Sequence, residues 1–257
     1  MLMKTKKQRF KNLSKIFTLA FCLVAIGLTL TLADFFSSLI TVGGFTFTNS
    51  DITISKYNLY AVSTASTTTT AVSEQLADTC KKQGGAGYIY ISDNSYYVLA
   101  SIYENKTDAE KVISNLKESN VLANLIEIEI NPISFASSLE SQEKTALENA
   151  VNIFKTTYKK LYDVSVSLDT AVINEVNARL AINELASEIK TTANNFVTLF
   201  DDKISSNLLN IKLKHGELLK VIDEIINPST SLPYTSQIKN SYCSAIFLLK
   251  DLASSLA

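Results

Sequence analysis

The stretch that decides the fold is residues 88–103, which reads YIYISDNSYYVLASIY. Its two halves are rich in aromatic and aliphatic residues, which is typical of β-strands, and Asp93-Asn94 between them is a hairpin turn signal. Strands are also indicated at residues 57–63 and 122–130, the second with isoleucine at every other position near its end. The sequence therefore predicts a hairpin flanked by two further strands.

Two amphipathic helices are predicted between these strands. Residues 67–83 place apolar side chains four apart and run into a glycine-rich segment, and residues 105–120 carry an apolar face of their own. The order over residues 56–131 is β-α-β-β-α-β, the split βαβ or ferredoxin-like arrangement. Right-handed crossovers then put both helices on one face of a four-stranded antiparallel sheet, and we expect the other face to be open.

Alternation along the strands predicts which side chains lie on that open face. We assign Leu59, Ala61, Val98, Ala100 and Ile102 to the core beneath the helices. The side chains predicted to point outward, which form the candidate binding site, are Tyr60, Val62, Tyr88, Tyr90, Tyr97, Leu99 and Ser101.

The strand at residues 96–103 resembles the strand that opens each half of a SPOR domain, Tyr-x-Val-x-Val-Gly-x-Phe. Here Tyr96 stands at the Tyr, Val98 and Ala100 at the apolar positions, Ser101 at the Gly and Tyr103 at the Phe. SPOR domains are modules of bacterial cell-division and sporulation proteins. The resemblance covers residues 56–131, and we expect a SPOR-type domain there.

The first half of the same segment departs further from the family pattern. Tyr60 stands where many members carry Gln, and Val62 stands where Gly is usual. The resemblance implies binding of septal peptidoglycan, namely glycan strands stripped of their stem peptides, on the open sheet face. Tyrosine suits that ligand, because its ring stacks on a sugar while its hydroxyl forms hydrogen bonds. The alternative is that these tyrosines simply suit strands, and that some lie under the C-terminal region.

The N-terminal segment has the pattern of a membrane anchor. Residues 1–15 carry six basic side chains and no acidic one, and residues 16–33 (IFTLAFCLVAIGLTLTLA) carry no charge. Such a run nearly spans the ~30 Å hydrocarbon layer, and the basic flank predicts a cytoplasmic N-terminus. We predict a cytoplasmic tail at 1–15, a single-pass anchor at 16–40, a linker or lead-in strand at 41–55, and extracytoplasmic domains beyond. The alternative is a cleaved signal peptide.

Charge argues against one class of partner. The chain has a formal net charge of -1, so the part beyond the six basic residues carries -7. Nucleic-acid binding requires clustered basic side chains, and we therefore expect none.

The C-terminal region, residues 132–257, has a helical composition, with one glycine and, after Pro132, only two further prolines. Its apolar spacing predicts a bundle of three or four helices, with a long coiled coil as the alternative. We expect this domain to contact a septal protein partner or to act as a spacer.

Catalytic chemistry is weakly represented. His215 is the single histidine and is predicted to be a solvated helix residue, and no motif for a nucleophile, metal or cofactor is found. Cys80 and Cys243 either pair or fill core positions. The leading hypothesis is a non-enzymatic, membrane-anchored peptidoglycan-binding protein of the septum. The alternatives are an extracytoplasmic assembly protein, indicated by burial of the tyrosines, and an enzyme with carboxylates converging in a cleft.

Overall fold

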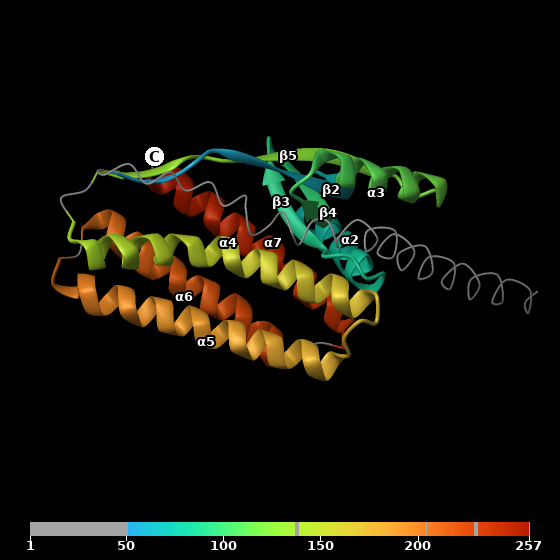
Figure 1. The fold of residues 1–257 in the computed structure, drawn as a ribbon. Coiled ribbons are helices and arrows are strands. Elements are labelled where there is room, and N and C mark those ends of the chain that lie inside the picture. Colours follow the sequence, from blue (N-terminus) through green and yellow to red (C-terminus); the bar gives the residue numbers. More distant parts are fainter. Residues whose placement is uncertain (1–50, 137–138, 204, 229–230, 257) are drawn as a thin grey trace, which may run out of the picture.

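A computed structural model describes residues 51–136, 139–203, 205–228 and 231–256. The fold is mixed α+β, as predicted, with an antiparallel sheet beside a long helical bundle (Figure 1). The predicted tail, the anchor at 16–40 and most of the linker lie outside the described residues. Within the described ranges no helix is both long and apolar enough to cross a membrane.

The main sheet has four antiparallel strands in the order β3-β4-β2-β5. The chain passes through them in the predicted β-α-β-β-α-β order. Asp93 and Asn94 both have positive φ, 49° and 58°, which suits the two-residue turn of the β3–β4 hairpin. The elements are β2 (Tyr57–Thr67), α2 (Thr70–Lys82), β3 (Tyr88–Ser92), β4 (Ser95–Tyr103), α3 (Lys106–Glu118) and β5 (Asn124–Ile130).

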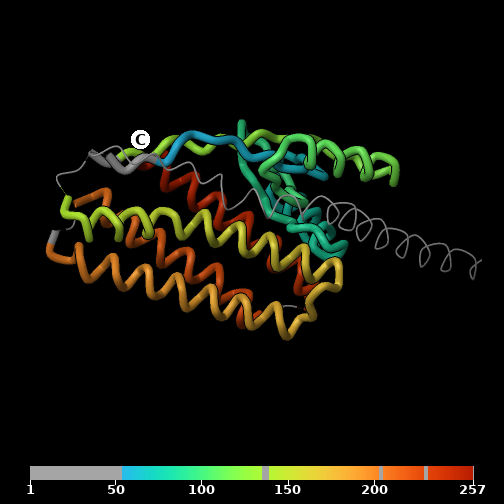
Figure 2. The backbone as a smooth tube through the Cα atoms, viewed as in Figure 1, coloured from blue at the N-terminus to red at the C-terminus, as the bar shows by residue number. Residues whose placement is uncertain are grey.

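Two short strands lengthen this sheet into a ribbon. β1 (Asp51–Ile54) pairs antiparallel with β6 (Ile133–Ala136), and the register that joins Tyr57 to Ile130 continues as Ile54 to Ile133. The break between them contains Pro132, which has no amide hydrogen to donate. Figure 2 shows the chain running from β1 into β2 along the bundle. β1 agrees with the lead-in strand expected at 41–55, whereas β6 was not predicted.

Four antiparallel helices form the C-terminal bundle, within the predicted three or four. Two begin at side-chain caps, because Asn174 accepts a hydrogen bond from the amide of Asn177 at 2.9 Å and Ser205 one from Leu208 at 3.4 Å. The helices are α4 (Ser141–Asp169), α5 (Glu175–Phe200), α6 (Ser206–Ile226) and α7 (Tyr234–Leu256), with a 3-10 turn η1 (Asp201–Lys203) between α5 and α6.

The main core is continuous from the sheet into the bundle. Leu59, Leu99 and Ile128 of the strands share one buried cluster with Phe154 of α4 and Tyr242 of α7. Two smaller clusters lie on the other side of the sheet, beneath α2 and α3. α7 contacts β3, β4, β5 and β6 directly. The prediction of an open sheet face is therefore wrong, because the last helix of the chain lies across it.

Candidate functional site

The predicted outward side chains lie on both faces of the sheet. Tyr60 and Val62 belong to the cluster beneath α3, where Val62 is fully buried, and Ser101 is the direct cross-strand partner of Val62. Their assignment to the outward face is wrong. Two bulges account for part of the error. Thr64 of β2 and Ala100 of β4 have no partner in the β2–β4 register, so beyond each of them the side chains alternate between the two sheet faces in the opposite phase.

The remaining four predicted residues lie on the second face, as expected, but they are covered by the protein itself. The ring of Phe247 on α7 stacks on Tyr88 at a centroid distance of 4.8 Å and on Tyr90 at 4.9 Å. Tyr97 lies beside Tyr90 at 6.3 Å, and Leu99 is fully buried in the main core. The tyrosines therefore form an internal contact, and their glycan-binding role stays a prediction.

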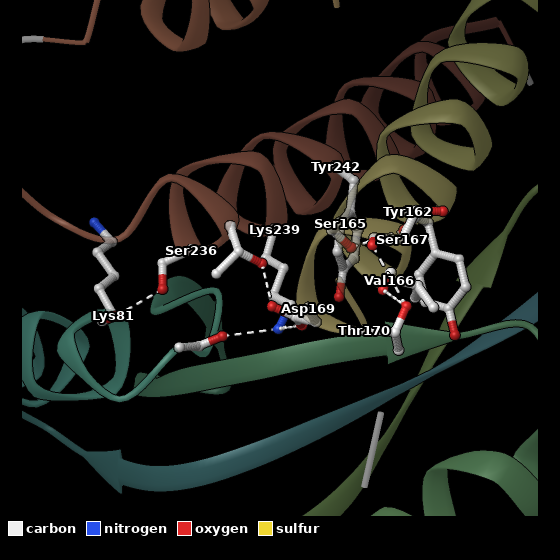
Figure 3. Close-up of polar contacts among 12 residues, drawn as sticks. Lys81, Tyr162, Ser165, Val166, Ser167, Asp169, Thr170, Ser236, Lys239 and Tyr242 are labelled. Atoms are coloured by element: carbon white, nitrogen blue, oxygen red, sulfur yellow. Dashed lines mark hydrogen bonds and ion pairs between the residues drawn. The ribbon is translucent and has the colours of Figure 1, made fainter. Parts of the chain in front are cut away.

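Polar side chains fix the start of α7 to the loop after α2 (Figure 3). Lys239 donates through Nζ to the carbonyl oxygen of Gly84 at 2.9 Å and forms an ion pair with Asp169 at the end of α4. Thr235 donates to the same Asp169 carboxylate at 2.6 Å, and Ser236 donates to the carbonyl of Lys81 at 2.6 Å. Three elements are joined at one place, which defines the position of the bundle on the sheet.

The glycine-rich segment after α2 allows this close approach. Gly87 has a φ of +54°, and a Cβ atom there would lie 2.4 Å from the carbonyl oxygen of Ala77. A Cβ atom on Gly85 would lie 2.5 Å from the sulfur of Cys80. A larger residue at either position would have to displace the loop or the Cys80 side chain, and a displaced loop would carry with it the Gly84 carbonyl group that Lys239 binds.

A row of aromatic side chains continues the contact. The amide of Ile102 on β4 donates to the hydroxyl of Tyr242 at 3.2 Å, which satisfies a backbone group just beyond the bulge. Tyr242 contacts Tyr162 edge-on at 5.8 Å, and Tyr162 contacts Tyr103 edge-on at 6.2 Å. We call all these contacts, from Tyr88 with Phe247 to Tyr103 with Tyr162, the sheet–bundle interface.

A charged cluster borders this interface. Glu104, just after β4, accepts a hydrogen bond from the hydroxyl of Tyr158 and pairs with Lys159, both at 3.0 Å. Burial raises the pKa of Asp163 to about 6, while Lys159 lowers it and Glu104 raises it further. Burial also lowers the pKa of Lys155. The sequence analysis missed this cluster, although residues 155, 159 and 163 of α4 are spaced four apart, which places them on one helix face.

His215 is an interior residue, so its prediction as a solvated residue is wrong. Its Nε2 lies 2.6 Å from the carbonyl oxygen of Ala150, and its ring packs against Phe154 and Phe196. Burial lowers its pKa. The face of α6 that carries His215 packs against α4 and α5, so His215 occupies a core position.

The two cysteines of the described ranges, Cys80 and Cys243, are buried and unpaired with each other. Among the residues that the structure describes, no three His, Cys, Asp or Glu side chains gather where they could hold a metal ion.

One exposed apolar surface stands out on the bundle. Val172, Val176 and Leu180 are 72%, 66% and 57% exposed, and the spacing of four places Val176 and Leu180 on one face of α5. Arg179, which precedes Leu180 in the sequence, places its guanidinium carbon 4.1 Å from the ring centroid of the buried Tyr234. We call Val172, Val176 and Leu180 the α5 apolar surface. Exposed aliphatic side chains one helical turn apart are typical of protein-binding surfaces.

No family model, no curated protein and no solved structure matches this chain.

Proposed function

We propose that this chain is a non-enzymatic, membrane-anchored assembly protein that holds a protein partner outside the cytoplasm. The observation that carries the proposal is the burial of the sheet tyrosines against α7. Because the sheet face is covered, the exposed apolar side chains that a partner could contact lie on the bundle instead. In the α5 apolar surface, Val176 and Leu180 offer a partner two aliphatic side chains one turn apart. An apolar helix face is the kind of partner surface that such side chains pack against.

The position of this surface suits an anchored protein. β1, the first described element, lies at the same end of the molecule as the C-terminus, where Asn131 contacts Ser254 (Figure 1). The turn from α4 to α5 lies at the opposite end. α5 has 26 residues and is therefore about 39 Å long. With the proposed anchor at 16–40 preceding β1, the α5 apolar surface would face away from the membrane.

The proposal is tested by site-specific photocrosslinking of the full-length chain in cells of its host. A photoreactive residue at position 176 should give a discrete adduct with one protein. The adduct should be lost when Leu180→Asp is added, because a charge in an apolar contact opposes its burial.

The matched control is the second exposed apolar pair, Leu209 and Leu213 on α6, which are 43% and 59% exposed and also four apart. A photoreactive residue at position 213 should give no such adduct, and Leu209→Asp should leave the adduct of position 176 intact. Equal adducts at 176 and 213, or none at 176, would contradict the proposal.

A second candidate function is septal peptidoglycan binding by a SPOR-type domain. The β-α-β-β-α-β order and the strand at residues 96–103 favour it. It would require α7 to leave the sheet, because Phe247 covers Tyr88 and Tyr90 and because Leu99 is fully buried.

This second function is tested with residues 44–257 on intact peptidoglycan sacculi and on sacculi stripped of stem peptides by an amidase. Preferential binding to the stripped sacculi, lost in a Tyr90→Ala, Tyr97→Ala variant that still folds, would support it. Equal retention of the variant and the unmodified protein on both preparations would assign the binding to another surface.

A further inference from the structure

The bundle carries a groove that neither proposed function uses. It lies between the first turns of α4 and the last turns of α5 and encloses about 490 Å³. That volume falls within the roughly 300–1,000 Å³ of typical ligand pockets. The groove is therefore large enough to receive part of another molecule.

The chemistry of the lining is uniform. Three primary amides, Gln142, Asn149 and Asn195, and three threonine hydroxyls line the groove, and none of its lining residues is charged or aromatic. The stretch at residues 191–200 (TTANNFVTLF) contributes one wall and contains no charged residue. On the floor, Ala146 and Leu199 add apolar area.

The amide groups are free to bind a ligand. Within the described part of the chain, the side chains of Gln142, Asn149 and Asn195 are exposed to solvent and form no hydrogen bond with the protein. Thr145 and Thr198 already donate to backbone carbonyl groups one turn earlier, at 3.0 and 2.9 Å, so their oxygen atoms face a ligand as acceptors. The groove thus offers paired donors and acceptors from amides, with additional acceptors from hydroxyls.

This set of groups matches a peptide backbone. A primary amide carries both N–H donors and a C=O acceptor, so it can pair with the N–H and C=O of an extended chain as a neighbouring strand does. A sugar would favour an aromatic ring for stacking, and an anion would favour a cation; the lining has neither. No charged side chain in the lining can pair with a charged ligand, which favours an uncharged one.

We infer that the groove binds an extended, uncharged segment of a partner protein. From residue 142 to residue 149 the wall of α4 extends about 10 Å, which corresponds to roughly three residues of an extended chain. The inference rests on the proposed assembly function, because it names the class of partner segment. Thr192 lies twelve residues beyond Leu180, or about 18 Å along α5, so the groove and the α5 apolar surface are separate.

The test uses the full-length protein in detergent micelles and a display library of hexapeptides built without Asp, Glu, Lys, Arg and His. Selected peptides should bind the unmodified protein and should bind both Asn195→Ala and Asn149→Ala at least ~10-fold more weakly, because each variant removes paired hydrogen bonds. These two positions lie on opposite walls of the groove, so the loss should appear independently in each.

The matched control is Asn194→Ala, which removes an exposed amide next to Asn195 but outside the groove. Peptide binding should be unchanged in that variant and in a Val176→Asp, Leu180→Asp variant, which separates failure of the groove from failure of the α5 apolar surface. Alanine suits exposed helix positions, and thermal melting by circular dichroism checks that each variant folds.

Three results would overturn the inference. One is a library from which no peptide is enriched. Another is a set of peptides whose binding is the same in Asn194→Ala and Asn195→Ala. The third is binding of chitotetraose, but of no peptide, in a manner that depends on Asn195, which would make the groove a glycan site.

Discussion

The two faces of the main sheet are covered in different ways. Beneath α2 and α3 the contacts involve small side chains such as Val62, Val98 and Ala109, which belong to two separate clusters. The other face packs against α7 with aromatic rings, and the amide of Ile102 reaches Tyr242 from 140 residues away in sequence. One face is therefore closed by neighbouring helices of the same motif, and the other by the distant end of the chain.

The polar contacts differ in the same way. At the start of α7, an ion pair of Lys239 with Asp169 and hydrogen bonds to the end of α2 and the loop after it accompany the apolar contact. A buried ion pair adds little net stability but penalises any docking that separates its members. The helices of the motif are therefore placed mainly by apolar packing, whereas α7 is also placed by directional contacts.

The largest effect is expected at the aromatic contact. Phe247→Ala should lower the free energy of unfolding by about 3 kcal/mol, because it removes a buried ring stacked between Tyr88 and Tyr90. Val112→Ala, on the buried side of α3, should lower it by only about 1.5 kcal/mol, from the loss of two buried carbon atoms.

Urea denaturation of residues 44–257 measures both free energies, and hydrogen exchange reports where the protein opens. Phe247→Ala should speed exchange in β3 and α7, whereas Val112→Ala should speed it in α3. If the two variants lose equal stability and exchange in the same elements, the two faces do not differ as described.

The next effect concerns the ion pair. Asp169→Ala should lower the free energy of unfolding by about 2 kcal/mol, because it deprives the largely buried Lys239 ammonium of its carboxylate. Adding Lys239→Met should restore most of that loss, since no desolvated charge then remains. A double-mutant cycle by urea denaturation measures the coupling, and additive losses would show that the pair does not act as a unit.

The smallest effect concerns pH. Burial raises the pKa of Asp163 from its ordinary value of 3.8 to about 6, so the folded state favours the protonated carboxyl. Stability is therefore lost as pH rises from about 4 to about 6. Asp163→Asn removes this loss and should stabilise the protein at pH 7 by at most about 1 kcal/mol, because solvent screens this partly exposed site. Below pH 4 the two proteins should be equally stable. Thermal melting across this range measures the difference, and the same gain at pH 3 would exclude titration of Asp163 as its cause.

The sequence alone determined the local elements. Strand alternation, the Asp93-Asn94 turn and the glycines after α2 depend on residues within a few positions of one another, and the β-α-β-β-α-β order followed from them. The bundle helices followed in the same way from the helical spacing of their apolar residues. β6 was not predicted, because a four-residue strand beside Pro132 can be recognised only when it is paired with its partner β1. The candidate site was predicted less well than the fold. The alternation of side chains along a strand assigns them to the two faces of the sheet, but it does not show which element covers each face.

Tertiary structure decided what each surface contacts. The tyrosines of β3 have the same amphipathic character whether they meet water, a sugar or Phe247, and only the docking of α7 selects among these. His215 likewise has the sequence context of a solvated residue, yet Phe154 and Phe196 enclose it. The groove of Asn149 and Asn195 needs two helices side by side, and their residues are more than forty positions apart. Contacts over such separations depend on how whole elements pack, which local sequence patterns do not record.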